Sequence, residues 1–173
     1  MPGAYGIEQS GMKAVIQRVR SASVSSVPAG GDPDAPVVAS IGVGMAVLAG
    51  FEKEDTDEER RWVAEKIAGL RVFEDGSGKM NRAVNDVNGA ILLVPNFTLA
   101  ADCRRGRRPG FDNAMEPARA AQEFERLVED VRAAAGPGVR VERGVFRATM
   151  LVTIENDGPV TLILDSRARG GAT

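Results

Sequence analysis

Histidine is absent from the 173 residues of this chain, and cysteine occurs once, as Cys103. The lack of histidine excludes Ser-His-Asp and Cys-His catalytic sites, histidine-ligated zinc, and the commonest general base near neutral pH. The single cysteine excludes an internal disulfide and every zinc site built from several cysteines, and it fits a reducing compartment. Any hydrolytic chemistry must therefore use other residue types.

Long apolar runs are also missing, since none approaches the roughly 20 residues that a membrane helix requires. Residues 1–11 lack the basic start and apolar stretch of a signal peptide, so we interpret them as a flexible extension and expect a soluble, cytoplasmic protein without membrane contact. The length predicts one domain, residues 12–166, followed by a flexible tail of residues 167–173. A net charge of −2 argues against a generally basic nucleic-acid-binding surface but allows a local basic patch.

The order of apolar and polar segments predicts a mixed α/β fold. Strand-like patterns occupy residues 12–27 and 37–52, and a helix follows the capping box of Thr56 and Glu59. After further strands, a second helix begins near Pro117, and three strand-like segments close the chain. This order indicates a mixed sheet with helices packed on one side.

The last two strand-like segments are separated by Asp157-Gly158-Pro159, a sequence that predicts a turn. A proline after glycine in such a turn is compatible with a plain trans turn or with a cis peptide bond. The residues alone leave both states open.

An apolar strand is predicted over residues 89–100, and it carries the sequence NFTL. Alternation along this strand would place Asn96 and Thr98 on one face, with Phe97 and Leu99 on the other. Thr98 could orient a water molecule or a ligand there, although threonine is common in strands for structural reasons alone.

Four of the five residues in RRGRR are arginine: Arg104, Arg105, Arg107 and Arg108. Forked guanidinium groups around a flexible glycine are suited to binding phosphates. The alternative interpretation is a solvated charged loop.

Scattered carboxylates offer a further candidate, an acid-base pair drawn from Glu52, Glu74, Asp75 and Asp102. Their spacing singles out no pair, and surface charges are the simpler interpretation. No metal site and no cofactor is predicted.

Six separated segments together resemble the D-aminoacyl-tRNA deacylase (D-tyrosyl-tRNA deacylase) family. In chain order they are MKAVIQRV, EKIAGLRVFED, GKMN, NFTLAAD, GRRPGF and NDGPVTLILDS, and they extend over residues 12–166. The resemblance is specific because all six segments occur in the same order, whereas each alone is weak.

The resemblance implies a three-layer α/β fold of stacked mixed sheets flanked by helices, and a homodimer with its active sites at the subunit interface. It implies an enzyme that hydrolyses the ester between a D-amino acid and the 3′ end of tRNA. Gly158-Pro159 is then a cis peptide inserted into the partner's active site, where backbone carbonyls reject L-aminoacyl groups. Such a filter leaves glycyl-tRNA as a substrate. The 2′-hydroxyl of the terminal adenosine assists hydrolysis, so no side-chain nucleophile is required.

The resemblance also assigns roles to individual residues. Phe97, Thr98 and Leu99 match the end of the family's Ser-Gln-Phe-Thr-Leu motif, which implies catalytic roles for Asn96, Phe97 and Thr98. Pro95 and Asn96 replace the serine and glutamine of that motif. This departure bears on the rate and the substrate range more than on the fold.

Arg18 matches an arginine that helps to fix the Gly-Pro turn, and Met150 matches a methionine that lines the pocket. Arg147 stands where the family usually has glycine, which adds bulk and charge. Residues 1–11 and the loop of residues 28–36 are additional to the family pattern.

Two alternative functions stay open. A divergent paralogue could proofread another mischarged tRNA, with Pro95-Asn96 as the sign of divergence and a trans bond at Gly158-Pro159. A binding protein could keep the pocket for the tRNA end and the RRGRR segment but have lost turnover.

Overall fold

The computed structural model describes residues 11–27 and 35–168. Three predicted segments lie largely outside the described residues: the extension of residues 1–11, the loop of residues 28–36 and the tail of residues 167–173. The strands are β1 (Lys13–Ser26), β2 (Val37–Ile41), β3 (Gly44–Gly50), β4 (Phe73–Glu74), β5 (Met80–Arg82), β6 (Ala90–Pro95), β7 (Arg140–Arg143) and β8 (Met150–Asp165). The helices are α1 (Asp57–Gly69) and α2 (Pro117–Ala135), with short 3-10 turns η1 (Asn85–Val87), η2 (Phe97–Ala100) and η3 (Ser166–Ala168).

Both long helices begin where the sequence predicts. At the start of α1, the Glu59 N–H donates to the Thr56 hydroxyl and the Thr56 N–H donates to the Glu59 carboxylate at 2.8 Å, which completes the capping box. At the start of α2, the Glu116 carboxylate accepts hydrogen bonds from two backbone N–H groups, and Pro117 occupies the first turn. Gly136, with φ at 79°, ends α2.

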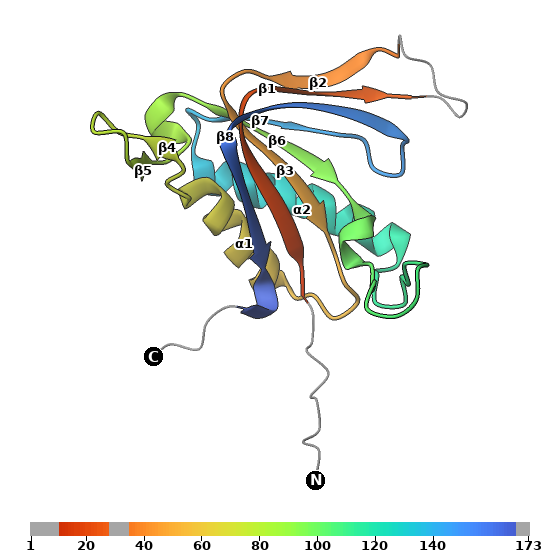
Figure 1. Ribbon diagram of the computed structural model, residues 1–173. Helices are drawn as coiled ribbons and strands as arrows, with labels where there is room; N and C mark the ends of the chain where they lie inside the picture. Colours follow the sequence, from red (N-terminus) through yellow and green to blue (C-terminus); the bar gives the residue numbers. More distant parts are fainter. Residues whose placement is uncertain (1–10, 28–34, 169–173) are drawn as a thin grey trace.

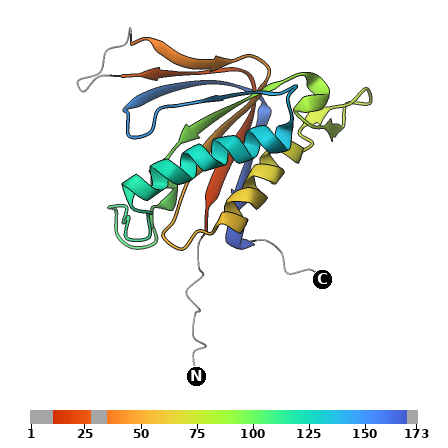
Figure 2. The same ribbon diagram turned by 180° about the vertical axis from the view of Figure 1, so that it is seen from behind.

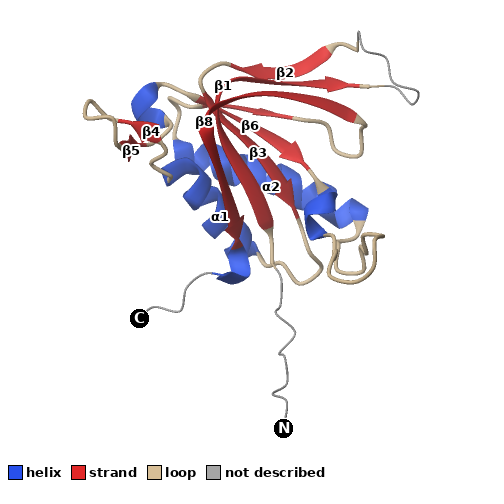
Figure 3. Cartoon of the chain, in the orientation of Figure 1, coloured by secondary structure: helices blue, strands red, loops and turns tan. Residues whose placement is uncertain are grey.

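The strands form a mixed sheet around β1. The first half of β1 pairs antiparallel with β3 and its second half with β2, while β8 pairs with β1 along both halves. From β3 the sheet continues through the parallel strands β6 and β7, and β4 and β5 form a separate two-stranded hairpin. This arrangement confirms the predicted mixed α/β fold (Figure 3).

The sheet is covered by helices on one face and by its own folded half on the other. Helices α1 and α2 lie together on one face (Figures 1 and 2), and Met45 and Val47 of β3 point into the core beneath them. On the other face, Leu92 of β6 belongs to a second core with Val24 of β1 and Ile41 of β2. Since β6 is not a hydrogen-bonded neighbour of β1 or β2, this second core shows that the sheet folds over itself to give the third layer.

The closing strand differs from the prediction. Residues 150–165 form one strand, β8, instead of two strands separated by a turn. Gln17 pairs with Thr161 and Val19 pairs with Asn156, so one residue of β1 stands opposite residues 157–160 of β8. β8 pairs with β1 both before and after residues 157–160, so the strand continues through this segment. We call these four residues the 157–160 bulge.

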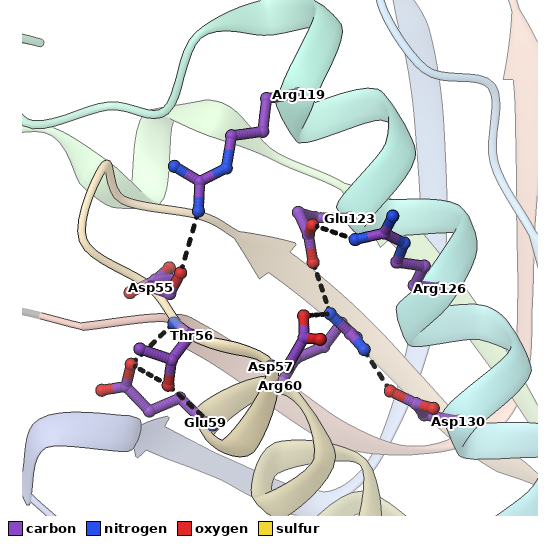
Figure 4. A network of polar contacts seen from close by, with 9 residues as sticks. All are labelled: Asp55, Thr56, Asp57, Glu59, Arg60, Arg119, Glu123, Arg126 and Asp130. Atoms are coloured by element: carbon purple, nitrogen blue, oxygen red, sulfur yellow. Dashed lines mark hydrogen bonds and ion pairs between the residues drawn. The ribbon is translucent and has the colours of Figure 1, made fainter.

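A buried ionic network joins α1 to α2 (Figure 4). The Arg60 guanidinium, on a residue only 5% exposed, contacts Glu123 at 2.5 Å, Asp57 at 2.6 Å and Asp130 at 2.8 Å. Hydrogen bonds to these carboxylates raise the pKa of Arg60 further above its ordinary value, against the opposing effect of burial. The helix pair therefore forms a fixed base beneath the sheet.

Within the described parts of the chain, neither helix is long and apolar enough to cross a membrane.

Candidate functional site

The segment that carries Thr98 is a turn, which corrects the predicted strand over residues 89–100. Strand β6 ends at Pro95, and residues Phe97–Ala100 form the 3-10 turn η2. The Asn96 side-chain oxygen accepts a hydrogen bond from the Thr98 N–H at 3.2 Å, and asparagine commonly ends a strand by bonding to the backbone two residues ahead. Asn96 and Thr98 do lie together, but a local turn brings them together.

The hydrogen bonds of this pair determine what it offers to a ligand. The Thr98 hydroxyl donates its proton to Asn96 Oδ1, so the hydroxyl oxygen keeps its lone pairs for an incoming donor. Thr98 is exposed, and among the described residues the Asn96 amide nitrogen makes no hydrogen bond. The pair therefore leaves an acceptor on the exposed Thr98 and a donor on the half-buried Asn96 without a partner among the described residues.

An exposed pair of aromatic rings adjoins Thr98. The Phe97 residue is 61% exposed and Phe111 is 39% exposed, with ring centroids 5.1 Å apart. Two neighbouring exposed phenyl rings make a surface on which a planar base can stack. Phe111 is not among the site residues predicted from the sequence, although it is the last residue of GRRPGF, one of the segments that carry the family resemblance.

The predicted arginine cluster forms an exposed loop directly after η2. Asp102 and Gly110 exchange backbone hydrogen bonds of 2.8 and 2.9 Å, which close residues 103–109 into what we call the arginine loop. Gly106 has φ at 70°, a conformation that favours glycine.

The four arginines of the loop are not equivalent. Arg104 binds Asp102 through both guanidinium and backbone, and these contacts hold the pKa of that carboxyl well below its usual range. Arg105, Arg107 and Arg108 are exposed and form no ion pair with any described residue. All four arginines are exposed, and three of them have no ion-pair partner among the described residues.

Met150 lies beside the C-terminal end of β6, where Pro95 precedes Asn96. The Val145 N–H contacts the Met150 sulfur at 3.4 Å, and a side chain at Gly144 would come within 3.0 Å of that sulfur and 3.3 Å of Pro95. The structure thus brings Met150 to the segment that contains Asn96, Phe97 and Thr98. We call these four residues the candidate site.

Arg18 and the 157–160 bulge form a second group. The Arg18 side chain is buried, and it donates to the Asp157 carbonyl at 2.9 Å and to the Val72 carbonyl at 2.7 Å. Asp157 directly precedes Gly158, and the Gly158-Pro159 peptide bond is cis. Arg18 therefore contacts the residue that directly precedes the Gly-Pro pair.

The two groups lie at different ends of the sheet. Pro95 is in register with Ala49 of β3, whereas Ala90, at the other end of β6, is in register with Gly44, the partner of Val19 beside the bulge. Five residues of strand span about 17 Å, and three strand spacings separate β6 from β8. One chain therefore does not bring Gly158-Pro159 next to Thr98.

The carboxylates considered from the sequence do not form an acid-base pair. Glu52 is buried and contacts Lys13 at 3.2 Å, Glu74 lies 3.8 Å from Arg18, and Asp75 accepts hydrogen bonds within the β4–β5 turn. Asp102 is bound to Arg104. In the part of the chain that the structure describes, no three Asp, Glu or Cys side chains are grouped to hold a metal ion.

Arg147 occupies the connection between β7 and β8 with φ at 62°. This left-handed region favours glycine, the residue that the family pattern has at this position. Arg147 is exposed and forms no ion pair with a described residue.

These features define a three-layer mixed α/β protein with a candidate site built from hydroxyl, amide and aromatic groups beside exposed arginines. The model of the family described as D-Tyr-tRNA(Tyr) deacylase matches residues 15–165. The chain belongs to this family, which confirms the resemblance seen in the sequence.

Similar proteins support the assignment along the whole domain. A D-aminoacyl-tRNA deacylase of Desulfitobacterium hafniense is 49% identical over 155 residues, which cover 90% of this chain and 97% of that protein. A D-aminoacyl-tRNA deacylase of Geobacter sulfurreducens is 47% identical over 162 residues, covering 94% of this chain and all of that protein.

Two solved structures share the fold. The c-Myc DNA unwinding element binding protein superimposes with a TM-score of 0.78 at 40% identity, covering 88% of this chain and 97% of that one. A probable eukaryotic D-amino acid tRNA deacylase superimposes with a TM-score of 0.72 at 18% identity, covering 89% of this chain and 98% of that one, which shows the fold alone.

Proposed function

We propose that this protein is a D-aminoacyl-tRNA deacylase, a cytoplasmic hydrolase that cleaves the ester between a D-amino acid and the 3′ end of tRNA. The observation that carries the proposal is the family match over residues 15–165, with near-complete coverage of deacylase relatives at 47–49% identity. The pair of Asn96 and Thr98 beside Phe97 supplies groups suited to this ester.

The arrangement of the candidate site suits the end of a tRNA. The terminal base stacks on Phe97 and Phe111, while Arg105, Arg107 and Arg108 contact phosphates of the acceptor strand. The Thr98 oxygen accepts a hydrogen bond from the bound end, and Met150 lines the pocket. Each of these contacts places the ester without forming a covalent bond to the enzyme.

Hydrolysis then depends on placement. A water molecule attacks the ester carbonyl, the bond to the 3′ oxygen breaks, and that oxygen takes up a proton. The neighbouring 2′-hydroxyl of the substrate assists this proton transfer, so no histidine is required. Holding a reactive ester in the productive geometry supplies much of the rate enhancement.

The chiral filter belongs to the partner subunit in this proposal. Carbonyl groups at Gly158-Pro159 accept hydrogen bonds from the α-ammonium group and leave no space for an L side chain, whereas a D side chain points outward. Glycine has no side chain to exclude, so glycyl-tRNA is a second substrate. The separation of the 157–160 bulge from Thr98 in one chain supports a site shared between two chains.

The β8 edge supports a homodimer. Among the described strands, β8 pairs with β1 alone, so its other edge has no strand partner in this part of the chain. Ile163 on this strand is 72% exposed, an apolar side chain that a second copy would cover.

The test of the function compares hydrolysis of D-tyrosyl-, L-tyrosyl- and glycyl-tRNA in the presence of a chelator. We expect cleavage of the D and glycyl esters with the L ester spared. Binding of tRNA without cleavage of any ester would identify a binding protein instead. Cleavage of a different mischarged tRNA with the D esters spared would identify the divergent paralogue.

The test of the shared site compares two exposed substitutions. Ile163→Asp places a charge on the β8 edge, and Met80→Asp places one on β5 at a residue that is 58% exposed. We expect Ile163→Asp to give monomers by analytical ultracentrifugation and to lose activity, while Met80→Asp retains the dimer and the activity. An active Ile163→Asp monomer would refute the shared site.

A further inference from the structure

Arg147 is the arginine nearest in sequence to Met150 of the candidate site, yet it belongs to neither group described above. It lies in residues 144–149, the connection between β7 and β8. The Gly144 N–H donates to the Leu93 carbonyl at 2.8 Å, and the Val27 N–H donates to the Thr149 carbonyl at 2.8 Å, so the connection is held at both ends. Phe146 packs against the core with its ring 6.5 Å from that of Phe124.

This connection borders the candidate site. Gly144 lies against Pro95 and the Met150 sulfur. Figures 1 and 2 place the connection from β7 to β8, η2 and the start of α2 at the same end of the molecule. Arg147 is therefore presented at the end of the sheet where the arginine loop also lies.

Arg147 forms no ion pair with a described residue, although one carboxylate lies within its electrostatic reach. Glu116 is the carboxylate whose pKa Arg147 helps to lower, after the larger effect of two backbone hydrogen bonds from Ala118 and Arg119. That carboxylate is already committed to capping α2. The left-handed backbone at Arg147 also favours glycine, so neither local conformation nor a salt bridge with a described residue accounts for an arginine there.

We propose that Arg147 is a second phosphate-binding position for the acceptor strand of tRNA, contributed by a segment separate from the arginine loop. This inference rests on the proposed function. Two exposed cationic segments at one end of the sheet contact the phosphate backbone of the tRNA at more points than the arginine loop alone. The additional contact fixes the orientation in which the 3′ end of the tRNA enters the site. Arg147 is a positioning residue and does not touch the ester.

The primary test measures the affinity for deacylated tRNA by fluorescence anisotropy over a series of salt concentrations. Arg147→Gly and Arg147→Asn remove the charge with residues that tolerate a left-handed backbone, so both variants keep the fold. Loss of one phosphate contact lowers the slope of log affinity against log salt by about 0.7–0.9 and weakens binding roughly 3- to 10-fold near 0.1 M salt.

Two further variants serve as controls. Arg147→Lys keeps the charge and should retain most of the salt dependence. Arg61→Gln removes an exposed arginine on α1, on the helical layer, and should leave the slope unchanged. Wild-type slopes in both neutral Arg147 variants would overturn the proposal, as would an equal loss of slope in Arg61→Gln.

Hydrolysis of D-tyrosyl-tRNA by the same variants gives the second readout. We expect Arg147→Gly to raise KM with kcat unchanged, since the residue acts in binding. A wild-type protein that binds tRNA but cleaves no aminoacyl ester would refute the proposed function, while the anisotropy slopes would still decide the role of Arg147.

Discussion

The Asn156 side chain binds both backbone polar groups of Val160. Its Oδ1 accepts from the Val160 N–H at 3.0 Å, and its Nδ2 donates to the Val160 carbonyl at 3.1 Å. The amide thereby replaces the partner strand at the place where β1 and β8 change register. These two hydrogen bonds join the two ends of the segment from Asn156 to Val160 and fix the conformation of the bulge.

Replacing Asn156 should loosen the bulge and weaken the discrimination between D and L substrates. Asn156→Ala removes both hydrogen bonds, which should lower the free energy of unfolding by about 1–2 kcal/mol. We expect the ratio of D-tyrosyl- to L-tyrosyl-tRNA cleavage rates to fall, because the Gly158-Pro159 carbonyls are no longer held in place. Asn156→Asp keeps the acceptor and should lose less of the ratio. An unchanged ratio in Asn156→Ala would show that the bulge does not depend on this side chain.

Removing the Thr98 hydroxyl should reduce turnover. Thr98→Val deletes the acceptor and leaves Asn96 Oδ1 without its hydroxyl donor, and we expect a loss of about 10²-fold in kcat, the scale of losing one positioned polar group. Thr98→Ser keeps the hydroxyl and should retain most of the rate in single-turnover hydrolysis. If valine and serine variants were equally active, Thr98 would have a structural role only.

The buried carboxyl of Asp55 should make stability depend on pH. Burial, together with the nearby Glu59 and Glu52 carboxylates, raises its pKa from 3.8 to about 7, against a backbone hydrogen bond from Glu52 and the charge of Arg167. Between these two values the folded protein holds a proton that the unfolded chain releases. Stability should therefore fall as pH rises from about 4 to 7, by at most about 1.4 kcal/mol per pH unit.

Asp55→Asn isolates this effect, because the amide is neutral at every pH and can still accept from the Glu52 N–H. The free energy of unfolding of this variant, relative to the wild type, should grow across the same range and level off above pH 7. Chemical denaturation at several pH values measures the difference in free energy of unfolding between the variant and the wild type. Contributions that the other carboxylates make equally to both proteins cancel in this difference. Parallel curves for the two proteins would show that Asp55 is ionised when folded.

Breaking the buried network between α1 and α2 should be costly. Arg60→Met leaves Glu123 and Asp130 without their shared cation, and we expect a loss of about 3–5 kcal/mol in urea denaturation. Adding Glu123→Leu should recover a large part of that loss. Arg140→Met, which breaks a surface pair with Glu142, should cost less than about 1 kcal/mol. Equal losses in the two single variants would argue against the buried network.

Features determined by neighbouring residues were predictable from the sequence. The capping box of Thr56 and Glu59 and the position of Pro117 locate both helices, because each depends on hydrogen bonds or backbone limits within one turn. Strand alternation predicts that Asn96 and Thr98 lie together, and the structure brings them together by a different local geometry. The Asn96 side chain instead ends the strand, a choice between two local structures that alternation alone does not decide.

Features that depend on distant partners were not predictable. The sequence around Gly158 predicts a turn between two strands. In the structure, β1 pairs with β8 both before and after residues 157–160, so β8 continues as one strand. The contact of Phe97 with Phe111 likewise depends on how the arginine loop folds back. The placement of Met150 beside Pro95 requires the sheet to fold over itself, which no local pattern records.

The distance between Thr98 and Gly158 within one chain has a consequence for how activity responds to dilution. If each working site takes its hydroxyl from one chain and its chiral filter from another, a lone chain holds two incomplete halves. Specific activity should then be constant at high protein concentration and fall in proportion to concentration once pairs dissociate. The amount of enzyme in the cell would thereby set both the number of sites and the fraction of them that are complete.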